Sequence, residues 1–493
     1  MINQLGDSKR MLFTEPTFLL LFLPALLLTY FLVPRVLRNV LLTIGSLFFY
    51  AWGEWRFLPL LVGSVALNYW IAIWLASTPP SPRRKWILAV GIGSDLLLLL
   101  IFKYAAFTAD NLNILLRLVR MDPLHLPAIT LPLGISFFTF HKISYKVDVY
   151  RGNAEAKRNP MDLALYILLF PQLIAGPIVR YNEIATQITH RSVQLIDLSY
   201  GIRRFIIGFG KKMIIANSVA PVADQVFGLP TNELTMPIAW LGIVCYALQI
   251  YFDFSGYSDM AIGLARMFGF TFPENFNYPY VSTSITEFWR RWHISLSRWF
   301  RDYVYIPLGG NRGGTAGTYR NLLLVFFLCG LWHGASWGFV VWGLFHGSFL
   351  IFERLRVGKW LTAAPQPIKH GYTLLIVLVG WVFFRAEGLR HAVGFLAAMF
   401  GVARGDANVQ HLGLYLNGVV FTALVAGVLG STPICHWLRL MFAGWCAQRE
   451  SRTRSVLDGL VKVGMLVALG TVFLVSSMMV AAGTYNPFIY FRF

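Results

Sequence analysis

Long apolar runs recur along the whole chain, and they constrain the fold more than any other feature of the sequence. A helix needs about 20 apolar residues to cross the hydrocarbon core of a bilayer. Only 13% of the 493 residues are charged, against roughly 25% in soluble domains. The sequence therefore predicts a polytopic membrane protein, with candidate spans near 12–33, 38–53, 57–77, 87–107, 162–179, 237–252, 321–353, 372–385, 412–430 and 460–482.

The predicted fold class is all-α: a single membrane domain over residues 1–493 with about 11 to 13 transmembrane helices. A mean hydropathy of +0.59 excludes ordinary soluble, disordered and fibrous proteins. The run 321–353 is long enough for one tilted span or a broken pair. Shorter stretches near 131–140, 202–219 and 256–270 fit re-entrant or interfacial segments, since irregular backbone at membrane depth must be buried in protein.

The charge of the chain is +19, from 42 basic and 23 acidic residues. The basic residues cluster in short loops between apolar runs, which fits the anionic cytoplasmic leaflet better than nucleic acid. Arg35, Arg38 and the basic loop 79–85 would be cytoplasmic if the N-terminus lies outside. Lys9 and Arg10 oppose this orientation. The apolar run that follows them is too long for a secretory signal, so we expect an uncleaved first span.

A polar stretch, residues 273–320, interrupts the apolar runs and contains a periodic segment. Large apolar residues recur at i, i+3, i+4 and i+7 between 284 and 303, with charged residues on the other face. This composition, rich in Trp and Arg, predicts an amphipathic helix in the membrane interface. Its apolar stripe consists of Ile285, Phe288, Trp289, Trp292, Leu296, Trp299, Phe300 and Tyr303.

Two histidines are the candidate chemical groups. His293 falls at the border of the apolar stripe, where it is either a packed interfacial histidine or an acid or base that faces a cavity. His333 lies inside a strongly apolar run, where an ionisable residue is by default a functional hypothesis. The glycines around His333 permit either close helix packing or the approach of a substrate. We expect His346 to be structural. The flanking glycines are Gly330, Gly334 and Gly338.

Further polar residues within apolar surroundings suggest a network that orients the histidines. A metal site is less favoured, because no histidine accompanies the carboxylates near 251–259. The loop Leu308–Gly314 could present backbone N–H groups and Arg312 to phosphates, or it could be a flexible turn. The expected network consists of Asp253, Ser255, Tyr257, Asp259, Trp332 and Trp337.

Several other chemistries lack their sequence signals. The four cysteines are scattered without a CxxC pair, so neither a disulfide framework nor a zinc site is expected. HExxH and Walker A motifs are absent from the sequence. Imidazole, with an ordinary pKa of about 6.5, can accept and return a proton at neutral pH. The two histidines therefore remain the candidates for acid–base chemistry.

Six segments spread over almost the whole chain are specific in combination: Leu131–His141, Gln172–Pro177, Tyr251–Asp259, Phe288–Ser297, Leu331–Trp337 and Asn486–Phe493. On these segments the chain resembles the membrane-bound O-acyltransferase family, within a bacterial branch related to alginate O-acetyltransferases. The resemblance implies a helical body with a thin centre, in which donor and acceptor meet in a funnel. The central histidine of the family corresponds to His333, and the partner polar position to His293.

The resemblance also implies a reaction. Acetyl-CoA is the expected donor, used as a substrate with no permanently bound cofactor. The acetyl group would pass outward, often through a periplasmic partner protein, to a polysaccharide such as alginate, cellulose or peptidoglycan. His333 would be the general base and His293 a supporting acid–base or orienting group. The expected location is the bacterial inner membrane.

A basic face near the expected site either holds the CoA phosphates or anchors the helix at the interface. Two other functions stay open: a transporter or flippase, which internal repeats would favour but the sequence does not show, and a non-catalytic scaffold of a polysaccharide export complex. The basic residues are Arg290, Arg291, Arg298, Arg301 and Arg312.

Overall fold

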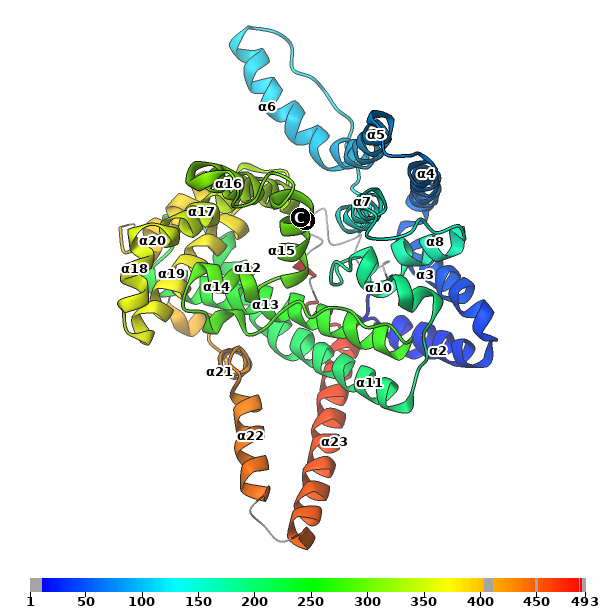
Figure 1. The fold of residues 1–493 in the computed structure, drawn as a ribbon. Coiled ribbons are helices and arrows are strands. Elements are labelled where there is room, and N and C mark those ends of the chain that lie inside the picture. The colour runs from blue at the N-terminus through cyan, green and yellow to red at the C-terminus, as the bar shows by residue number, and fades with distance from the viewer. Residues whose placement is uncertain (1–10, 403–410, 448–450, 487, 490–493) are drawn as a thin grey trace.

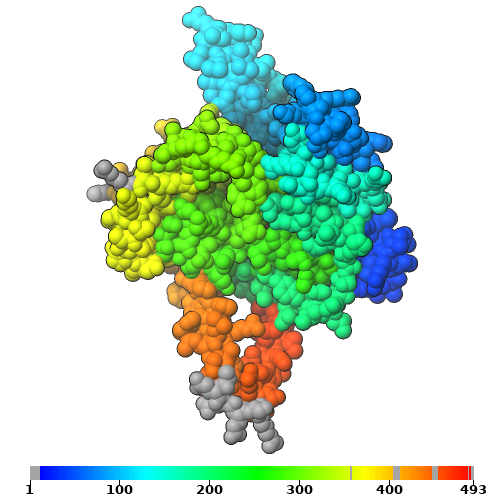
Figure 2. Space-filling model, in the orientation of Figure 1, coloured from blue at the N-terminus to red at the C-terminus, as the bar shows by residue number. Residues whose placement is uncertain are grey.

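A computed structural model describes the fold of residues 11–402, 411–447, 451–486, 488 and 489 (Figure 1). These residues form helices joined by turns and loops, and none of them lies in a β-strand. The expected all-α class is therefore confirmed. Figure 1 shows a body around the long helix α13 (Met236–Met267), with α6 (Ala105–Leu118) projecting from one end. The space-filling view shows α22 (Ile434–Ala447) and α23 (Ser451–Ala481) standing clear of the body at the other end (Figure 2).

In the N-terminal half of the chain, residues 23–189 form one side of the body, and residues 195–228 lie along α13 (Figure 1). Proline at the first turn starts several of its helices, where its missing N–H costs no hydrogen bond. Its helices are α2 (Leu23–Leu32), α3 (Arg38–Glu54), α4 (Leu58–Ser77), α5 (Pro82–Leu99), α6, α7 (Ile135–Arg151), α8 (Pro160–Leu168), α9 (Phe170–Leu173), α10 (Tyr181–Thr189), α11 (Leu195–Gly210) and α12 (Asn217–Gly228). Single π-helical turns precede α2, α6 and α12 at Phe18–Phe22, Leu100–Tyr104 and Lys211–Ala216.

The C-terminal half contributes the central helix and the opposite side (Figure 1). Its helices are α13, α14 (Ile285–Arg291), α15 (Ile294–Phe300), α16 (Gly314–His333), α17 (Trp337–Arg354), α18 (Arg356–Ala363), α19 (Gln366–Arg385), α20 (Leu389–Met399), α21 (Gly418–Gly430), α22 and α23. Short 3-10 turns occur at Arg35–Leu37, Trp55–Phe57, Pro279–Val281 and Leu412–Leu414, and a π-helical turn follows α15 at Arg301–Tyr305.

Helices α11 and α13 approach each other closely through two pairs of glycines. A Cβ on Gly208 would lie 2.5 Å from the carbonyl oxygen of Gly256, and a Cβ on Gly201 would lie 2.6 Å from that of Gly263. The contacts are reciprocal, because a Cβ on Gly256 would meet the Gly208 oxygen at 2.7 Å. Small residues allow this backbone-to-backbone contact in membrane helices. The pairing holds α13 in the middle of the body.

Replacing Gly256 with leucine should therefore destabilise the whole protein. The side chain would collide with α11 backbone, which cannot rotate away, so we expect a loss of about 3 kcal/mol or more. Thermal unfolding of the purified protein in detergent measures the effect. Gly93→Leu is the matched control, because nothing lies within 4 Å of a Cβ built at Gly93. An unchanged melting temperature for the Gly256 variant would contradict the packing described here.

The number of membrane-crossing helices is smaller than the sequence predicts. By length and composition, six helical runs of the described residues can cross a membrane, or seven if a bent pair counts as one. This number of candidate runs is below the expected 11 to 13, and one of them, Arg35–Ser77, contains both α3 and α4. Hydropathy alone cannot separate apolar residues that face lipid from those that fill the interior. The runs are Arg35–Ser77, Pro82–Leu118, Leu195–Gly228, Met236–Met267, Gln366–Arg385 and Thr453–Ala481, and the bent pair is Gly418–Gly430 with Ile434–Cys446.

The ambiguous stretches also resolve into regular structure. Residues 202–219 and 256–270 fall mainly in the long runs Leu195–Gly228 and Met236–Met267, so they are not separate re-entrant segments. The run 321–353 is a broken pair, α16 and α17, separated by an extended residue at Gly334. Lys9, Arg10 and part of the C-terminal segment lie outside the described residues.

The amphipathic helix expected over 284–303 is broken in two. Helix α14 ends at Arg291 and α15 begins at Ile294, with His293 between them at φ 44° and ψ 54°. The segment near Asn275 supplies the missing backbone partners: the Ile294 N–H donates to the Asn275 carbonyl at 2.9 Å. The apolar stripe is buried in the protein core, apart from the half-buried Tyr303.

Candidate active site

His293 occupies the break between α14 and α15, and its side chain is fully buried. A positive φ is uncommon for a residue with a Cβ and persists where the surrounding structure imposes it. The turn directs the imidazole against the ring of Phe254, with the ring centroids 4.7 Å apart and the planes nearly perpendicular. A continuous helix would have left this residue at the border of the stripe, so the break is what buries it.

The hydrogen bonds around Asn275 determine the tautomer of His293. The backbone N–H of Ser295 can only donate, and it approaches Asn275 Oδ1 at 3.3 Å, so that atom is an acceptor. His293 Nδ1 lies 3.0 Å from the same oxygen and must therefore carry the hydrogen. In the neutral imidazole this leaves the lone pair on Nε2, which is buried and has no hydrogen-bond partner among the described residues. Burial lowers the pKa of His293 to about 3, which favours the neutral ring.

His333 is the last residue of α16, with its side chain 6% exposed. Its ring is enclosed by aromatic rings, with centroid distances of 4.9 Å to Trp332, 5.0 Å to Trp342 and 5.1 Å to Phe384. The Nδ1 atom is buried without a hydrogen-bond partner among the described residues. A nitrogen that gains nothing from the folded protein is free to contact a bound molecule.

The glycines around His333 pack helices together. A Cβ on Gly330 would lie 2.3 Å from the Phe339 carbonyl oxygen, and one on Gly334 would lie 2.1 Å from the Phe339 ring. A Cβ on Gly338 would meet the Phe383 carbonyl oxygen at 3.0 Å. Protein atoms therefore occupy the space beside each glycine, and the close-packing alternative of the sequence analysis holds for all three.

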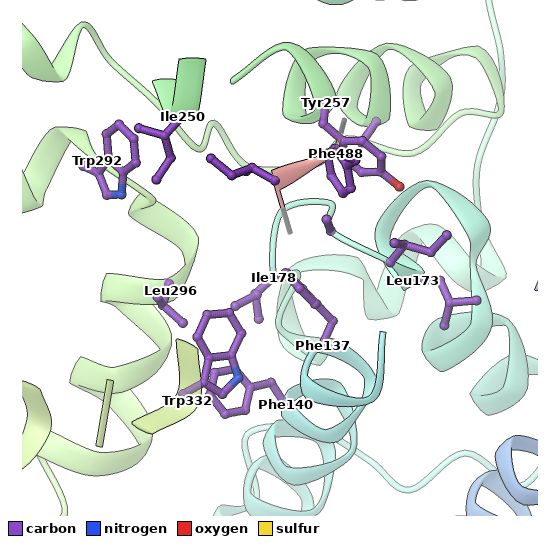
Figure 3. Packing of buried hydrophobic residues seen from close by; sticks show 14 of the residues in the cluster. Phe137, Phe140, Leu173, Ile178, Ile250, Tyr257, Trp292, Leu296, Trp332 and Phe488 are labelled. Atoms are coloured by element: carbon purple, nitrogen blue, oxygen red, sulfur yellow. The ribbon is translucent and has the colours of Figure 1, made fainter. Parts of the chain in front are cut away.

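Both imidazoles contact the indole of Trp332. The centroid of the Trp332 ring lies 6.2 Å from that of His293 and 4.9 Å from that of His333. The indole is itself held by Phe140, at a centroid distance of 5.2 Å with nearly parallel planes. Figure 3 shows Trp332 beside Phe140, with Phe137 and Leu296 nearby. Residues 40 positions apart in the sequence thus converge on one side chain.

Lys103 is a neighbour of His333 that the sequence analysis missed. Its Nζ donates to the carbonyl oxygens of Trp332 at 2.5 Å and of His333 at 3.2 Å. These are orphan carbonyls at the C-terminal end of α16, where a cation is favourable. The signal was present in the sequence, because Lys103 is an ionisable residue within an apolar run.

The aspartates of the expected network contact lysines and an arginine instead of the histidines. Asp253 pairs with Lys212 at 2.6 Å, and Asp259 pairs with Lys211 and Arg204, both at 2.7 Å. These ion pairs join α13 to α11 and the π-helical turn that follows it. Asn275 is the residue that orients His293, and a lone asparagine in a polar stretch carries no sequence signal for that role.

The remaining network residues are dispersed. Ser255 and Tyr257 are buried in α13, where the Tyr257 ring stacks on Phe13 at a centroid distance of 4.7 Å. The Trp337 side chain is 53% exposed, and its Nε1 donates to Asn111 Oδ1 at 2.9 Å. Only Trp332 of the expected network contacts both histidines.

The five predicted donor-binding arginines divide into two groups. Arg291 pairs with Glu287 at 2.9 Å and Arg301 with Asp302 at 2.7 Å, so their charges are partly neutralised. Arg290, Arg298 and Arg312 are exposed, and none of them forms an ion pair with a described residue. The last three retain guanidinium groups available to an anion.

The remaining features are the surroundings of His346 and the candidate metal ligands. The His346 ring lies 5.4 Å from the Trp342 ring, and a Cβ on Gly380 would meet its Nε2 at 2.6 Å, so it is tightly enclosed. Within the described ranges, no group of three or more His, Cys, Asp or Glu residues could hold a metal ion.

Comparisons with known proteins identify the family. The family model described as MBOAT, membrane-bound O-acyltransferase family, matches residues 125–382. The chain is 43% identical to the probable alginate O-acetylase AlgI of Pseudomonas putida, over 98% of this chain and 100% of that protein. It is 36% identical to the peptidoglycan O-acetyltransferase of Helicobacter pylori, over 98% of both chains. A teichoic acid D-alanyltransferase of Bacillus subtilis is 31% identical over 51% of this chain and 66% of its own.

The matched region contains His293, His333 and the whole of α13, and Lys103 lies outside it. The helical fold, the apolar spans and the relatives agree with one another. The chain belongs to the membrane-bound O-acyltransferase family and is a multi-pass membrane O-acyltransferase.

Proposed function

We propose that the protein moves an acetyl group from cytoplasmic acetyl-CoA toward an extracytoplasmic polysaccharide, with His333 as the general base. The observation that carries this proposal is the convergence of His333 and His293 on Trp332, each with a buried ring nitrogen that has no hydrogen-bond partner among the residues described. Free imidazole nitrogens at membrane depth suit proton transfer during attack on a thioester.

The reaction is an acyl transfer that balances without a further reagent. The hydroxyl oxygen of the acceptor forms a bond to the acetyl carbonyl carbon, and the bond from that carbon to the CoA sulfur breaks. His333 takes the hydroxyl proton and returns it to the leaving sulfur. His293 presents a lone pair at Nε2, because Asn275 holds its hydrogen on Nδ1, and this lone pair accepts a hydrogen bond from a second hydroxyl of the acceptor, which orients the attacking one.

The charge distribution supports a cytoplasmic donor. Arg84 at the start of α5 donates to carbonyls at the ends of α4 and α7, and Arg151 at the end of α7 donates to the Asp302 carbonyl. Helix ends with basic side chains therefore gather on one face, which the positive-inside rule assigns to the cytoplasm. Arg301 and the nearby Arg298 and Arg312 belong to the same region of the chain.

This arrangement gives the exposed arginines a role. The CoA phosphates would contact Arg290, Arg298 and Arg312, which have no ion-pair partner among the described residues. The acceptor is proposed from the relatives, two of which are named for the O-acetylation of alginate and of peptidoglycan. An alginate-like polymer is the first choice, with peptidoglycan or cellulose as alternatives and a periplasmic protein as the carrier to the polymer. The inner membrane is the corresponding location.

A labelled-acetyl assay tests the proposal. Inside-out membrane vesicles that contain the protein and enclose the polysaccharide receive acetyl-CoA labelled in the acetyl group on the outside. Both the released CoA thiol and the label in the enclosed polysaccharide are measured. We expect thiol release and label transfer that depend on the protein. Label that enters the vesicles without thiol release would favour a transporter. Normal polymer acetylation in cells with the histidines replaced would favour a scaffold. Either result would overturn the proposed function.

A further inference from the structure

An open cleft of about 600 Å³ is lined by neither His293 nor His333. It lies where the end of α2, the start of α3 and the loop after α10 meet. Most of its charged lining is basic. The residues that line the cleft are Arg35, Val36, Arg38, Asn39, Asp162, Ile188, Thr189, His190, Arg191 and Ser192.

Two of its guanidinium groups are held against one tyrosine. Arg38 lies 4.8 Å from the centre of the Tyr30 ring, and Arg191 lies 5.9 Å from it. Arg191 also lies 4.4 Å from the Phe270 ring and donates to Asn39 Oδ1 at 2.7 Å and to the Phe268 carbonyl. The two cations are thus fixed near each other before any ligand binds, which lowers the entropy cost of binding.

These two cations lack a neutralising carboxylate. Other partly buried arginines of the protein, such as Arg204 and Arg385, form ion pairs with aspartates. Neither Arg38 nor Arg191 forms an ion pair with a described residue, and Arg38 Nε and Arg191 Nη2 are buried without a hydrogen-bond partner there. Asp162 is the carboxylate of the lining, and it accepts a hydrogen bond from Asn39 at 3.0 Å.

Placing like charges together without a counter-ion is costly, and a bound anion removes that cost. Arginine is the side chain best suited to hold a phosphate, because its N–H groups form paired hydrogen bonds with phosphate oxygens. Arg35 adds a third cation at the mouth of the cleft. Three arginines against one aspartate therefore leave a positive site.

Exposed apolar side chains border the cleft. Leu32, Val36 and Leu37, on either side of Arg35, are 74%, 87% and 50% exposed. Exposed apolar side chains next to arginines are the surroundings of a phospholipid, with its acyl chains on the apolar residues and its phosphate on the cations. In the orientation proposed above, Arg35 and Arg38 face the cytoplasm together with the basic residues 79–85.

We propose that this cleft is a phosphate-binding site, separate from the histidine site, for a phosphate group of an anionic phospholipid or of a soluble compound. The site is defined by Arg35, Arg38 and Arg191 and does not depend on the acetyl-transfer reaction. Arg191 also holds the backbone of neighbouring segments, so Arg35 and Arg38 are the residues to replace.

The test measures binding to the purified full-length protein in neutral detergent. One arm titrates short-chain phosphatidylglycerol and the other inorganic phosphate, each followed by the rise in melting temperature. We expect the double variant Arg35→Gln/Arg38→Gln to bind the effective anion about tenfold or more weakly than the wild type. Arg83→Gln is the matched control, an exposed arginine in the first turn of α5. The melting temperature without anion reports whether each variant is folded. If the double variant is not folded, Arg38→Lys, which keeps the positive charge, replaces it in the test.

Each outcome has a definite meaning. Binding of the lipid alone assigns the site to a headgroup, and binding of inorganic phosphate as well assigns it to phosphate in general; both support the proposal. It would be overturned if neither anion stabilised the wild type, if the folded double variant bound as tightly as the wild type, or if Arg83→Gln weakened binding equally. If the double variant does not fold, anion binding by the wild type and by Arg38→Lys is compared with and without 1 M salt. Binding that 1 M salt leaves unchanged would also overturn the proposal, because a phosphate site held by charge must weaken in high salt.

Discussion

The variant His333→Ala is expected to transfer acetyl groups about 10²–10⁴ times more slowly than the wild type, the range for loss of a general base. The Nδ1 atom of this imidazole is buried and has no hydrogen-bond partner in the part of the chain that the structure describes, so the substitution removes a proton acceptor without breaking a hydrogen bond there. The measurement is the initial rate of CoA thiol release with saturating acetyl-CoA and a polysaccharide acceptor.

The enclosure of His333 by Trp332, Trp342 and Phe384 makes a folding control necessary. Alanine would leave a cavity among these rings, which costs stability. His333→Gln fills more of the space, and it should be as slow as alanine because an amide is not a base. His125→Ala, an exposed histidine, is the matched control for loss of an imidazole. A folded His333 variant with the wild-type rate would remove the catalytic role.

The fold class could be predicted because lipid imposes a simple rule on sequence. Every backbone group must be paired within the membrane, so long apolar runs imply helices. The same rule predicted more spans than the six or seven candidate runs that length and composition select in the structure. Helix α13 is apolar because it is surrounded by protein, whereas α23 is apolar and largely exposed, and hydropathy treats them alike.

The two histidines differ in how far the sequence could identify them. His333 stands out because an ionisable side chain in an apolar run is costly and needs a reason. The same rule applied to Lys103 would have found the lysine that caps α16. His293 was placed by a helical wheel, yet its burial depends on a break in the helix that the sequence does not signal, since neither Gly nor Pro occupies 292–294.

Asn275 shows what sequence patterns cannot supply. Its side chain joins His293, Ser295 and Ser258 through hydrogen bonds that form only when the 275–277 segment folds back on α15. The aspartates of α13 were the better guess from composition, but their lysine and arginine partners come from α11 and the following turn. Such pairings are tertiary and leave no periodic trace.

His293 provides the second large effect, and two replacements separate its possible roles. His293→Ala removes both ring nitrogens, leaves Asn275 Oδ1 without that donor and opens space beside Phe254. We expect the rate of acetyl transfer to fall by about 10²-fold or more. In His293→Gln the amide oxygen can accept a hydrogen bond as Nε2 does, but it cannot take a proton. If His293 orients the hydroxyl, this variant should lose only about tenfold, the value of roughly one hydrogen bond.

The comparison is decided by the rates and not by stability alone. An orienting role predicts that glutamine is at least several times faster than alanine, with both variants melting near the wild type. An acid–base role predicts that the two variants are equally slow, because neither side chain titrates near neutral pH. Asn275→Leu should lower the rate while His293 remains, since the hydrogen on Nδ1 would no longer be fixed. Wild-type rates in both His293 variants would show that the buried lone pair on Nε2 takes no part in the reaction.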